Sequence, residues 1–199
     1  MRLSSGYPAA AFTATTIDGE TVSLTQFAGN PVLLMFLRYA SCPMCNLRVH
    51  DVARRYAHLH EQGLEIIAFF HSSADSVRAH AGRRRYPFRL IADPALTVYR
   101  LYGVETSWWR LLLSTVRPGF YIDWLRSMRH GFWGGVAWQM GKMPADFLIG
   151  PDGRIAIAHY GADIGDHLPF ATIDASLRSF RPTAAREPVS LARPEPPRP

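Results

Sequence analysis

The chain has 199 residues, of which 48% are hydrophobic and 12% aromatic, and its formal net charge is +6. This composition indicates a globular protein with one domain plus additions. No apolar run approaches the roughly 20 residues that span a bilayer, and residues 1–11 lack the apolar stretch of a secretory signal. The basic balance favours acidic surfaces in general, but no nucleic-acid-binding motif accompanies it, so we expect no nucleic-acid partner.

Hydrophobic periodicity and turn residues predict alternating strands and helices. Residues 12–15 and 21–24 flank Asp18-Gly19 and predict a hairpin with a tight turn. The run 32–37 is continuously apolar, which is typical of a strand buried on both faces. The further elements expected are helices at 43–61, 72–82, 94–102 and 169–180, strands at 64–70 and 88–92, and a second hairpin at 146–150 and 154–160. This order predicts an α/β sandwich with a central sheet flanked by helices.

The two cysteines of the chain, Cys42 and Cys45, follow the predicted strand 32–37 in the motif C-P-M-C. One helical turn separates them, so the thiols lie close enough for a disulfide. Cys42 falls near the helix N-cap, where unpaired backbone N–H groups and the helix dipole stabilise a thiolate. Pro43 suits the first helical position, where its missing N–H is not needed. A strand that runs through C-x-x-C into a helix is typical of thioredoxin-type redox sites, and we expect such a dithiol in the cytoplasm.

Other uses of the cysteine pair remain: half of a zinc site, a Cu(I)-carrying thiol metal chaperone, or inert buried thiols. Structural zinc takes four ligands, and the chain has no further cysteine. His50, His58 and His60 follow on the same predicted helix, but His50 does not share one face well with the cysteines. The eight histidines show no H-x-x-x-H spacing, so we expect neither a metal site nor a cofactor.

Two segments differ from the rest of the chain. Residues 106–139, the Trp-rich segment, carry all five tryptophans, and Pro118-Gly119 divides them into two predicted helices. We interpret this segment as a helical flap whose tryptophans pack on the domain or across a homodimer. A wall of the substrate pocket and an interfacial membrane patch are alternatives, although we do not expect membrane binding. Residues 181–199 hold six prolines, which predicts a disordered tail after a domain of residues 1–180.

Four short stretches carry a family resemblance. They are D-G-E-T-V-S-L at 18–24, R-Y-A-S-C-P-M-C-N at 38–46, A-D-P followed by Y-G-V between 92 and 104, and F-L-I-G-P-D-G-R-I at 147–155. In this order they resemble the peroxiredoxin-like proteins of the alkyl hydroperoxide reductase/thiol-specific antioxidant (AhpC/TSA) superfamily. The resemblance spans about residues 6–180 apart from the Trp-rich segment. It implies a thioredoxin-like three-layer sandwich with an N-terminal β-hairpin and a helical insertion, and an antioxidant thiol oxidoreductase.

The sequence departs from the peroxiredoxin pattern at its site. Peroxiredoxins use P-x-x-x-T-x-x-C, and by spacing their peroxidatic cysteine falls on Cys45, the threonine on Cys42 and the proline on Arg38. The arginine that they place before a later strand falls on Pro144. Instead, Met143-Pro144 resembles the cis-proline that faces a thioredoxin disulfide, with an ordinary trans proline at a strand start as the alternative. We therefore predict Cys42, Cys45 and Arg38 as catalytic residues, and Met143, Pro144 and Pro43 as substrate-binding residues.

Two mechanisms fit these residues, and both end at a Cys42–Cys45 disulfide that an external thiol must reduce. In the thioredoxin-like mechanism, Cys42 attacks and Cys45 resolves the mixed disulfide. In the peroxiredoxin-like mechanism, Cys45 attacks a peroxide, becomes a sulfenic acid and condenses with Cys42. Helix position favours Cys42 as the lower-pKa thiol, whereas the family alignment favours Cys45. Arg38 either stabilises the charged site or is a surface arginine at a strand end.

The expected function is therefore a thiol oxidoreductase that reduces peroxides, with protein disulfide reduction as the alternative. A non-enzymatic binding module that uses Trp108 and Trp109 is a hypothesis from another class. Asp51, Arg89 and Asp93 are candidates for orienting site groups, but solvated or capping roles fit them better. The sequence leaves open the reductant, the oligomeric state and the role of the Trp-rich segment.

Overall fold

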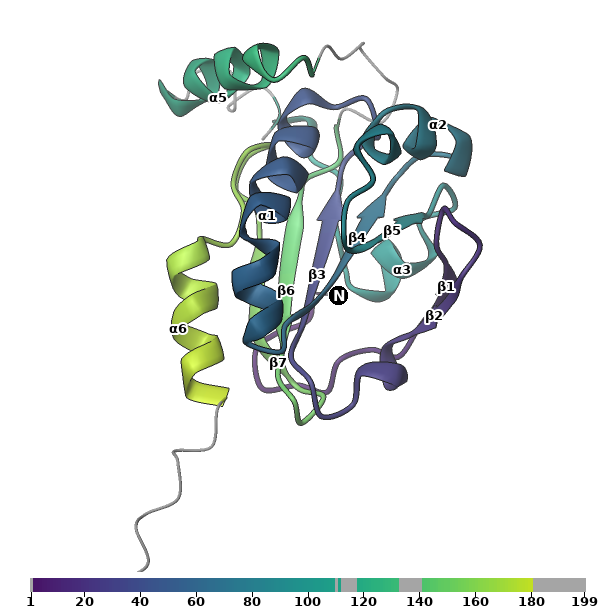
Figure 1. Cartoon of the computed structure of the whole chain (residues 1–199), viewed down its shortest axis with the longest axis vertical. Coiled ribbons are helices and arrows are strands. Elements are labelled where there is room, and N and C mark those ends of the chain that lie inside the picture. Colours follow the sequence, from purple (N-terminus) through teal and green to yellow (C-terminus); the bar gives the residue numbers. More distant parts are fainter. Residues whose placement is uncertain (1, 110, 112–117, 133–140, 181–199) are drawn as a thin grey trace, which may run out of the picture.

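The computed structural model describes residues 2–109, 111, 118–132 and 141–180. The predicted tail at 181–199 and parts of the Trp-rich segment, including Trp133 and Trp138, lie outside these residues. In the described part, a five-stranded sheet runs through the middle of the molecule with helices on both faces (Figure 1). The strand order is β5-β4-β3-β6-β7, in which β3, β4 and β5 are parallel and β6 and β7 are antiparallel to their neighbours. The strands are β3 (Val32–Leu37), β4 (Glu65–Phe70), β5 (Arg89–Ala92), β6 (Ala145–Ile149) and β7 (Ile155–Tyr160).

The helices form the outer layers of this mixed sandwich. On one face, α1 (Pro43–Glu61), α2 (Ala74–Ala79) and α6 (Phe170–Phe180) contribute to one buried cluster. On the other face, α3 (Thr97–Leu101) packs with the N-terminal segment. The predicted thioredoxin-like three-layer architecture is confirmed.

The central strand β3 is buried on both faces because its side chains alternate between the two layers. Leu33, Met35 and Leu37 join the cluster under α1. Leu34 and Phe36 join the second cluster, where the Phe36 ring stacks on Phe69 at 4.9 Å and other aromatic rings surround it. This double burial explains why the run 32–37 is continuously apolar.

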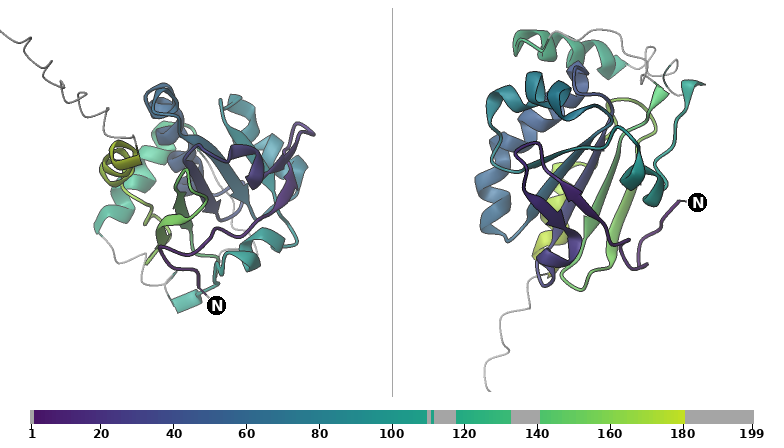
Figure 2. Two further views of the ribbon diagram at one scale, coloured as in Figure 1. Left: turned by 90° about the horizontal axis from the view of Figure 1, so that it is seen from below. Right: turned by 90° about the vertical axis from the view of Figure 1, so that its right-hand side faces the viewer.

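The N-terminal hairpin is also present. Its strands β1 (Thr13–Thr15) and β2 (Thr21–Ser23) pair antiparallel, and the 3₁₀ turn η1 (Leu24–Phe27) follows. Figure 2 shows this hairpin beside β5, and a bridge between Thr16 and Ile91 joins the two.

Two predicted helix boundaries are wrong. The helix expected at 94–102 begins only at Thr97, since Leu96 takes a left-handed conformation with φ of 56°. The Asp93 carboxylate accepts hydrogen bonds from the N–H groups of Thr97 and Val98, both at 2.8 Å, so Asp93 caps the helix from outside it. The helix expected at 72–82 ends at Ala79 and continues as the 3₁₀ turn η2 (Ala81–Arg84).

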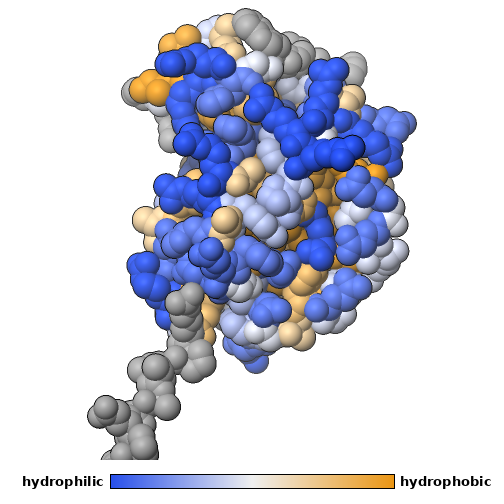
Figure 3. All heavy atoms as spheres, in the orientation of Figure 1, coloured by the Kyte–Doolittle hydropathy of each residue, from blue (hydrophilic) through white to orange (hydrophobic). Residues whose placement is uncertain are grey.

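The helix α5 (Pro118–Arg129) lies across the N-terminal end of α1 (Figure 1). Its Arg126 pairs with Asp51 of α1 at 3.2 Å, and Phe120 packs against the core cluster. Trp108 and Trp109 are 60% and 68% exposed, so they are not buried against the domain, and their packing across a dimer stays a prediction. Several large hydrophobic side chains of α5 are exposed, and they form an apolar patch at the upper left of Figure 3. Its residues are Tyr121, Ile122, Trp124 and Leu125. No helix in the described part of the chain is long and apolar enough to cross a membrane.

Candidate active site

The cysteine pair lies where β3 gives way to α1, as the sequence predicts. Cys42 is the N-cap residue of α1, with extended backbone angles, and Pro43 occupies the first helical turn. Both cysteines are 1% exposed and neither forms a disulfide. The Cys42 N–H donates to the Tyr39 carbonyl at 3.0 Å, so the loop between strand and helix is a closed turn.

Arg38 contacts both sulfur atoms. Its backbone N–H donates to Cys45 Sγ at 3.3 Å, and its guanidinium Nη1 lies 3.7 Å from Cys42 Sγ. The residue is only 2% exposed, and its guanidinium stacks over the Tyr39 ring at 5.2 Å. The alternative of a surface arginine is therefore wrong: Arg38 places a buried positive charge beside Cys42.

The two thiols are held in opposite states of protonation. Burial alone would raise the pKa of Cys42, but the Cys45 thiol, the Arg38 charge and the N–H groups of Met44 and Cys45 outweigh it and lower that pKa to about 6. Burial raises the pKa of Cys45 well above its ordinary value, and the adjacent negative charge on Cys42 acts in the same direction. At neutral pH this pair is a Cys42 thiolate that accepts a hydrogen bond from the Cys45 S–H group.

Asn46 is a structural support of the site that sequence reasoning missed. Its side-chain Nδ2 donates to the carbonyl oxygens of Ala40 and Cys42 at 2.7 and 2.9 Å, and it is 5% exposed. Ser72 assists from the neighbouring strand end, where its hydroxyl oxygen accepts the Ala40 N–H at 3.0 Å. The signal in the sequence was the asparagine directly after C-P-M-C, a residue type that commonly bonds backbone groups at turns.

The cis-proline prediction is wrong. No peptide bond among the described residues is cis, so Met143–Pro144 is trans. The segment before it pairs with residues 104–107: Met143 N–H donates to the Glu105 carbonyl at 3.3 Å, and Thr106 bridges to Lys142. This pairing already uses the Met143 backbone and leads the chain in extended form into β6, where a trans proline before the first strand residue fits. Met143 is nevertheless buried in the cluster that contains both cysteines.

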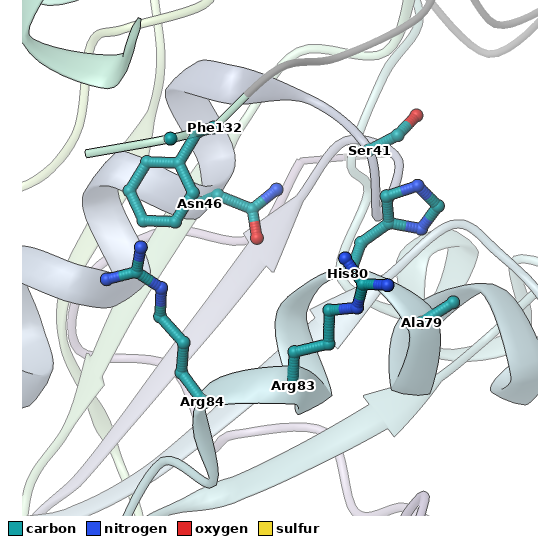
Figure 4. A pocket seen from close by; sticks show the side chains of 8 residues that line it. Ser41, Asn46, Ala79, His80, Arg83, Arg84 and Phe132 are labelled. Atoms are coloured by element: carbon teal, nitrogen blue, oxygen red, sulfur yellow. The ribbon is translucent and has the colours of Figure 1, made fainter. Parts of the chain in front are cut away.

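Two cavities meet at Ser41, the residue before Cys42. One, of about 410 Å³, is lined by Tyr39, Ser41, His71 and Pro94, among others. Burial and the nearby Lys142 lower the pKa of His71, so this histidine is neutral at pH 7. The other, of about 190 Å³, lies on the far side of Ser41 toward Asn46 and η2 (Figure 4). Neither lining includes Cys42 or Cys45, but both cavities reach the residue that precedes Cys42.

A second buried polar group lies near the site and was not predicted. Asp146 of β6 is fully buried and accepts the Leu168 N–H at 2.7 Å. His167 and Arg48 lie 3.1 and 3.4 Å from its carboxylate. Burial would raise the pKa of Asp146, but the charges of His167 and Arg48 and these hydrogen bonds lower it to about 2. The network ties α1 to β6 and to the loop before α6, so we assign it a structural role.

The remaining candidates have structural contacts. Arg89 pairs with Glu65 at 2.9 Å on the neighbouring strand, Asp51 pairs with Arg126, and Asp93 caps α3. None of these contacts involves a cysteine. The described residues contain no group of three or more His, Cys, Asp or Glu side chains that could hold a metal ion.

The sequence and fold of the chain were compared with those of known proteins. The chain is 33% identical to the chloroplastic peroxiredoxin Q of Triticum aestivum over 106 residues, which are 53% of this chain and 49% of that protein. It thus spans about half the length of that relative.

Solved structures share the fold. Peroxidoxin BcpB from Mycobacterium tuberculosis has a TM-score of 0.63 and 17% identity, over 90% of this chain and 97% of that chain. Peroxiredoxin Q from Xanthomonas campestris has a TM-score of 0.59 and 17% identity, over 88% and 96%. The model of the AhpC/TSA family matches residues 5–158, which is most of the described domain. The chain therefore belongs to the AhpC/TSA family.

Proposed function

We propose that the protein is a thiol-dependent peroxidase in which Cys42 attacks the peroxide. The observation that carries this proposal is the buried Cys42 thiolate, held between the Arg38 guanidinium and the Cys45 thiol. A thiolate is the nucleophile in thiol chemistry, and a pKa near 6 keeps it charged at neutral pH. Family membership and relatives named peroxiredoxin support peroxide as the substrate. The family alignment favours Cys45 as the attacking residue, but its raised pKa makes it the weaker candidate here.

In the proposed first step, Cys42 Sγ attacks one oxygen of ROOH and the O–O bond breaks. Cys42 becomes a sulfenic acid, and the leaving alkoxide takes a proton to become ROH. Arg38 stabilises the charge that moves from sulfur to the leaving oxygen. The Cys45 thiol then attacks the sulfenic sulfur, which forms the Cys42–Cys45 disulfide and releases water. Two electrons from an external thiol return the pair to its starting state.

The first helical turn supports rapid closure of the disulfide. The Asn46 side chain holds the loop carbonyls of Ala40 and Cys42, which fixes the backbone that carries Cys42. Pro43 and Met143 border the pair and would contact the substrate, and Pro144 fixes the chain behind Met143. A cytoplasmic location fits a dithiol that must be reduced after each turnover.

A homodimer through the apolar patch on α5 is also part of the proposal. Ile122 and Leu125 are 62% and 56% exposed in one patch with aromatic neighbours. Exposed contiguous apolar surface of this kind commonly marks an interaction site.

Protein disulfide reduction is the second candidate, because a low-pKa cysteine at the start of a C-x-x-C helix also suits disulfide exchange. This candidate function was supported by the C-x-x-C motif and by the expected cis-proline, and the trans bond before Pro144 removes the second support. The binding-module and metal-chaperone hypotheses remain predictions, and the exposed Trp108 and Trp109 favour the former over the latter.

Stopped-flow oxidation of the reduced protein by hydrogen peroxide, followed by intact mass, tests the proposal. We expect oxidation far faster than that of free cysteine, ending in a product lighter by two hydrogens. Reaction at the free-cysteine rate would reject the peroxidase and leave disulfide reduction as the leading function. A protein in which both cysteines are replaced by serine is the control and should not react.

A further inference from the structure

The cavity of about 190 Å³ beside the cysteine loop has a basic lining (Figure 4). His80, Arg83 and Arg84 line it from the end of α2 and from η2, and among the described residues no acidic side chain contributes to the lining. Ser41 and Asn46 form the opposite wall. The cavity thus has cations on one side and the cysteine loop on the other.

The two arginines differ in how they are held. Arg84 donates to the His130 carbonyl and stacks over the Phe132 ring at 4.5 Å, so its position is fixed by the segment after α5. Arg83 has no hydrogen bond or ion pair with any described residue, and its guanidinium points into the same hollow (Figure 4). Its donors are therefore available to a ligand.

Histidine side chains lie beside the two arginines. His80 Nδ1 lies 2.9 Å from the Ser76 carbonyl, which can only accept, so its other ring nitrogen remains for the cavity side. The His50 and His130 rings lie 4.6 Å apart, tilted by 47°, and burial together with His130 and Arg84 lowers the pKa of His50. Planar guanidinium groups without acidic partners are suited to a carboxylate, which they bind with two parallel hydrogen bonds.

The cavity reaches the residue before Cys42 and a residue that is hydrogen-bonded to the Cys42 backbone. Ser41 directly precedes Cys42, and Asn46, on the opposite wall from the arginines, donates to the Cys42 carbonyl. A ligand anchored at Arg83 would therefore extend along the cysteine loop.

We propose that this cavity binds the carboxylate of a small molecule that reacts at Cys42, with Arg83 as its principal contact. The inference rests on the proposed thiol chemistry and names its co-substrate class. The carboxylate belongs either to an organic hydroperoxide or to the low-molecular-weight thiol that reduces the disulfide. In the second case, a thiolate RS⁻ attacks Cys42 of the disulfide and releases Cys45 as a thiolate. A second RS⁻ then attacks the mixed disulfide, giving RSSR and the Cys42 thiolate.

Paired reagents test the inference. In the thiol arm, protein oxidised with diamide is reduced by mercaptoacetate or by neutral 2-mercaptoethanol. In the hydroperoxide arm, reduced protein is oxidised by a short-chain carboxylated hydroperoxide or by its methyl ester. The measured quantity is the ratio of the two rate constants in each arm, compared between variants so that the intrinsic reactivity of each reagent cancels.

We expect Arg83→Gln to lower the charged-to-neutral ratio about fivefold in one arm, and Arg83→Glu to lower it about tenfold. Arg83→Lys should retain part of the preference. Arg85→Gln is the matched control. Arg85 is also exposed and lies two residues after Arg83, but it does not line the cavity, so its replacement removes the same charge without changing the lining. Added salt should weaken the preference of the wild type and leave the neutral reagents unaffected.

The arm that responds identifies the source of the carboxylate. Equal ratios in wild type and Arg83→Gln in both arms, or an equal loss in Arg85→Gln, would overturn the inference. Failure of the peroxidase proposal is distinguishable, since the methyl ester and hydrogen peroxide would then react slowly with every variant. The thiol arm starts from chemically oxidised protein and would still report on the cavity.

Discussion

The Arg38 guanidinium lies 3.7 Å from Cys42 Sγ, while the backbone N–H of the same residue donates to Cys45 Sγ at 3.3 Å. Arg38, directly after β3, thus contacts both sulfur atoms, and its positive charge lies beside the thiol of the N-cap residue Cys42. We predict that Arg38→Met raises the pKa of Cys42 above about 6, because burial is then opposed by fewer favourable contacts. The pH profile of iodoacetamide labelling at Cys42, with thiolate absorbance, measures this pKa.

Arg38→Lys is the control for that prediction, since it keeps a positive charge and the same backbone N–H. Its labelling profile should lie between those of the wild type and Arg38→Met. Identical profiles in all three proteins would show that the guanidinium does not set the charge of Cys42.

Asn46 should matter for both stability and redox chemistry. Asn46→Asp keeps the shape of the side chain but removes the donor to the Ala40 and Cys42 carbonyls. We expect a loss of about 2 kcal/mol in the free energy of unfolding, because the buried Ala40 carbonyl loses this donor and the Cys42 carbonyl keeps only the Asn46 backbone N–H. The added negative charge near Cys42 should also raise its pKa. Denaturant unfolding and the labelling profile check the two effects, and an unchanged midpoint and profile would contradict them.

Asp146 predicts an acid-sensitive fold. Its folded pKa is about 2, below the ordinary value of 3.8, so it stabilises the fold above its ordinary pKa. By linkage, this contribution, on the order of 2 kcal/mol, is lost as the pH falls from about 4 to about 2. Asp146→Asn should remove that pH dependence and cost about 3–5 kcal/mol near pH 7, since it leaves the charge of the buried Arg48 uncompensated.

Asp75→Asn provides the comparison for Asp146. Asp75 also pairs with an arginine, Arg78, at 2.8 Å, but its side chain is 96% exposed. Its replacement should cost less than about 1 kcal/mol. Equal unfolding midpoints for Asp146→Asn and Asp75→Asn would argue against a buried structural network.

The apolar patch on α5 predicts self-association. Ile122→Glu and Leu125→Glu place a charge on surface that a dimer would bury, so each should shift the protein to monomer in sedimentation velocity. Arg129→Gln, on the same helix and also exposed, should leave the distribution unchanged. A wild-type protein that is monomeric at every concentration would remove the dimer from the proposal.

The sequence predicted the bounds of those helices and strands that are set by residues within the element itself. The bounds of β3 and α1 follow from a continuous apolar run and from Pro43 at a helix start. The start of α3 could not be predicted in this way. Asp93 caps the helix from four residues before Thr97, and Leu96 takes a left-handed conformation although it is not a glycine.

In the candidate site, too, residues close together in sequence could be predicted and those brought together only by folding could not. Cys42, Cys45 and Arg38 lie within eight residues, so one motif identified them. Asp146, Arg48 and Leu168 are brought together from three distant parts of the chain, which no local spacing reveals. The trans form of Met143–Pro144 accompanies pairing with Glu105, a contact between remote segments. Ser41 and Arg83, on opposite walls of the basic cavity, are likewise adjacent only after folding.

If Cys42 is the attacking residue, its sulfur is oxidised before that of Cys45. Cys42→Ser and Cys45→Ser proteins are treated with one equivalent of hydrogen peroxide, and dimedone traps the sulfenic acid for peptide mass analysis. We predict that Cys45→Ser reacts rapidly and carries dimedone on Cys42, whereas Cys42→Ser reacts no faster than a free thiol. Rapid oxidation of Cys42→Ser with dimedone on Cys45 would contradict it and return the peroxidatic role to the position that the family alignment favours.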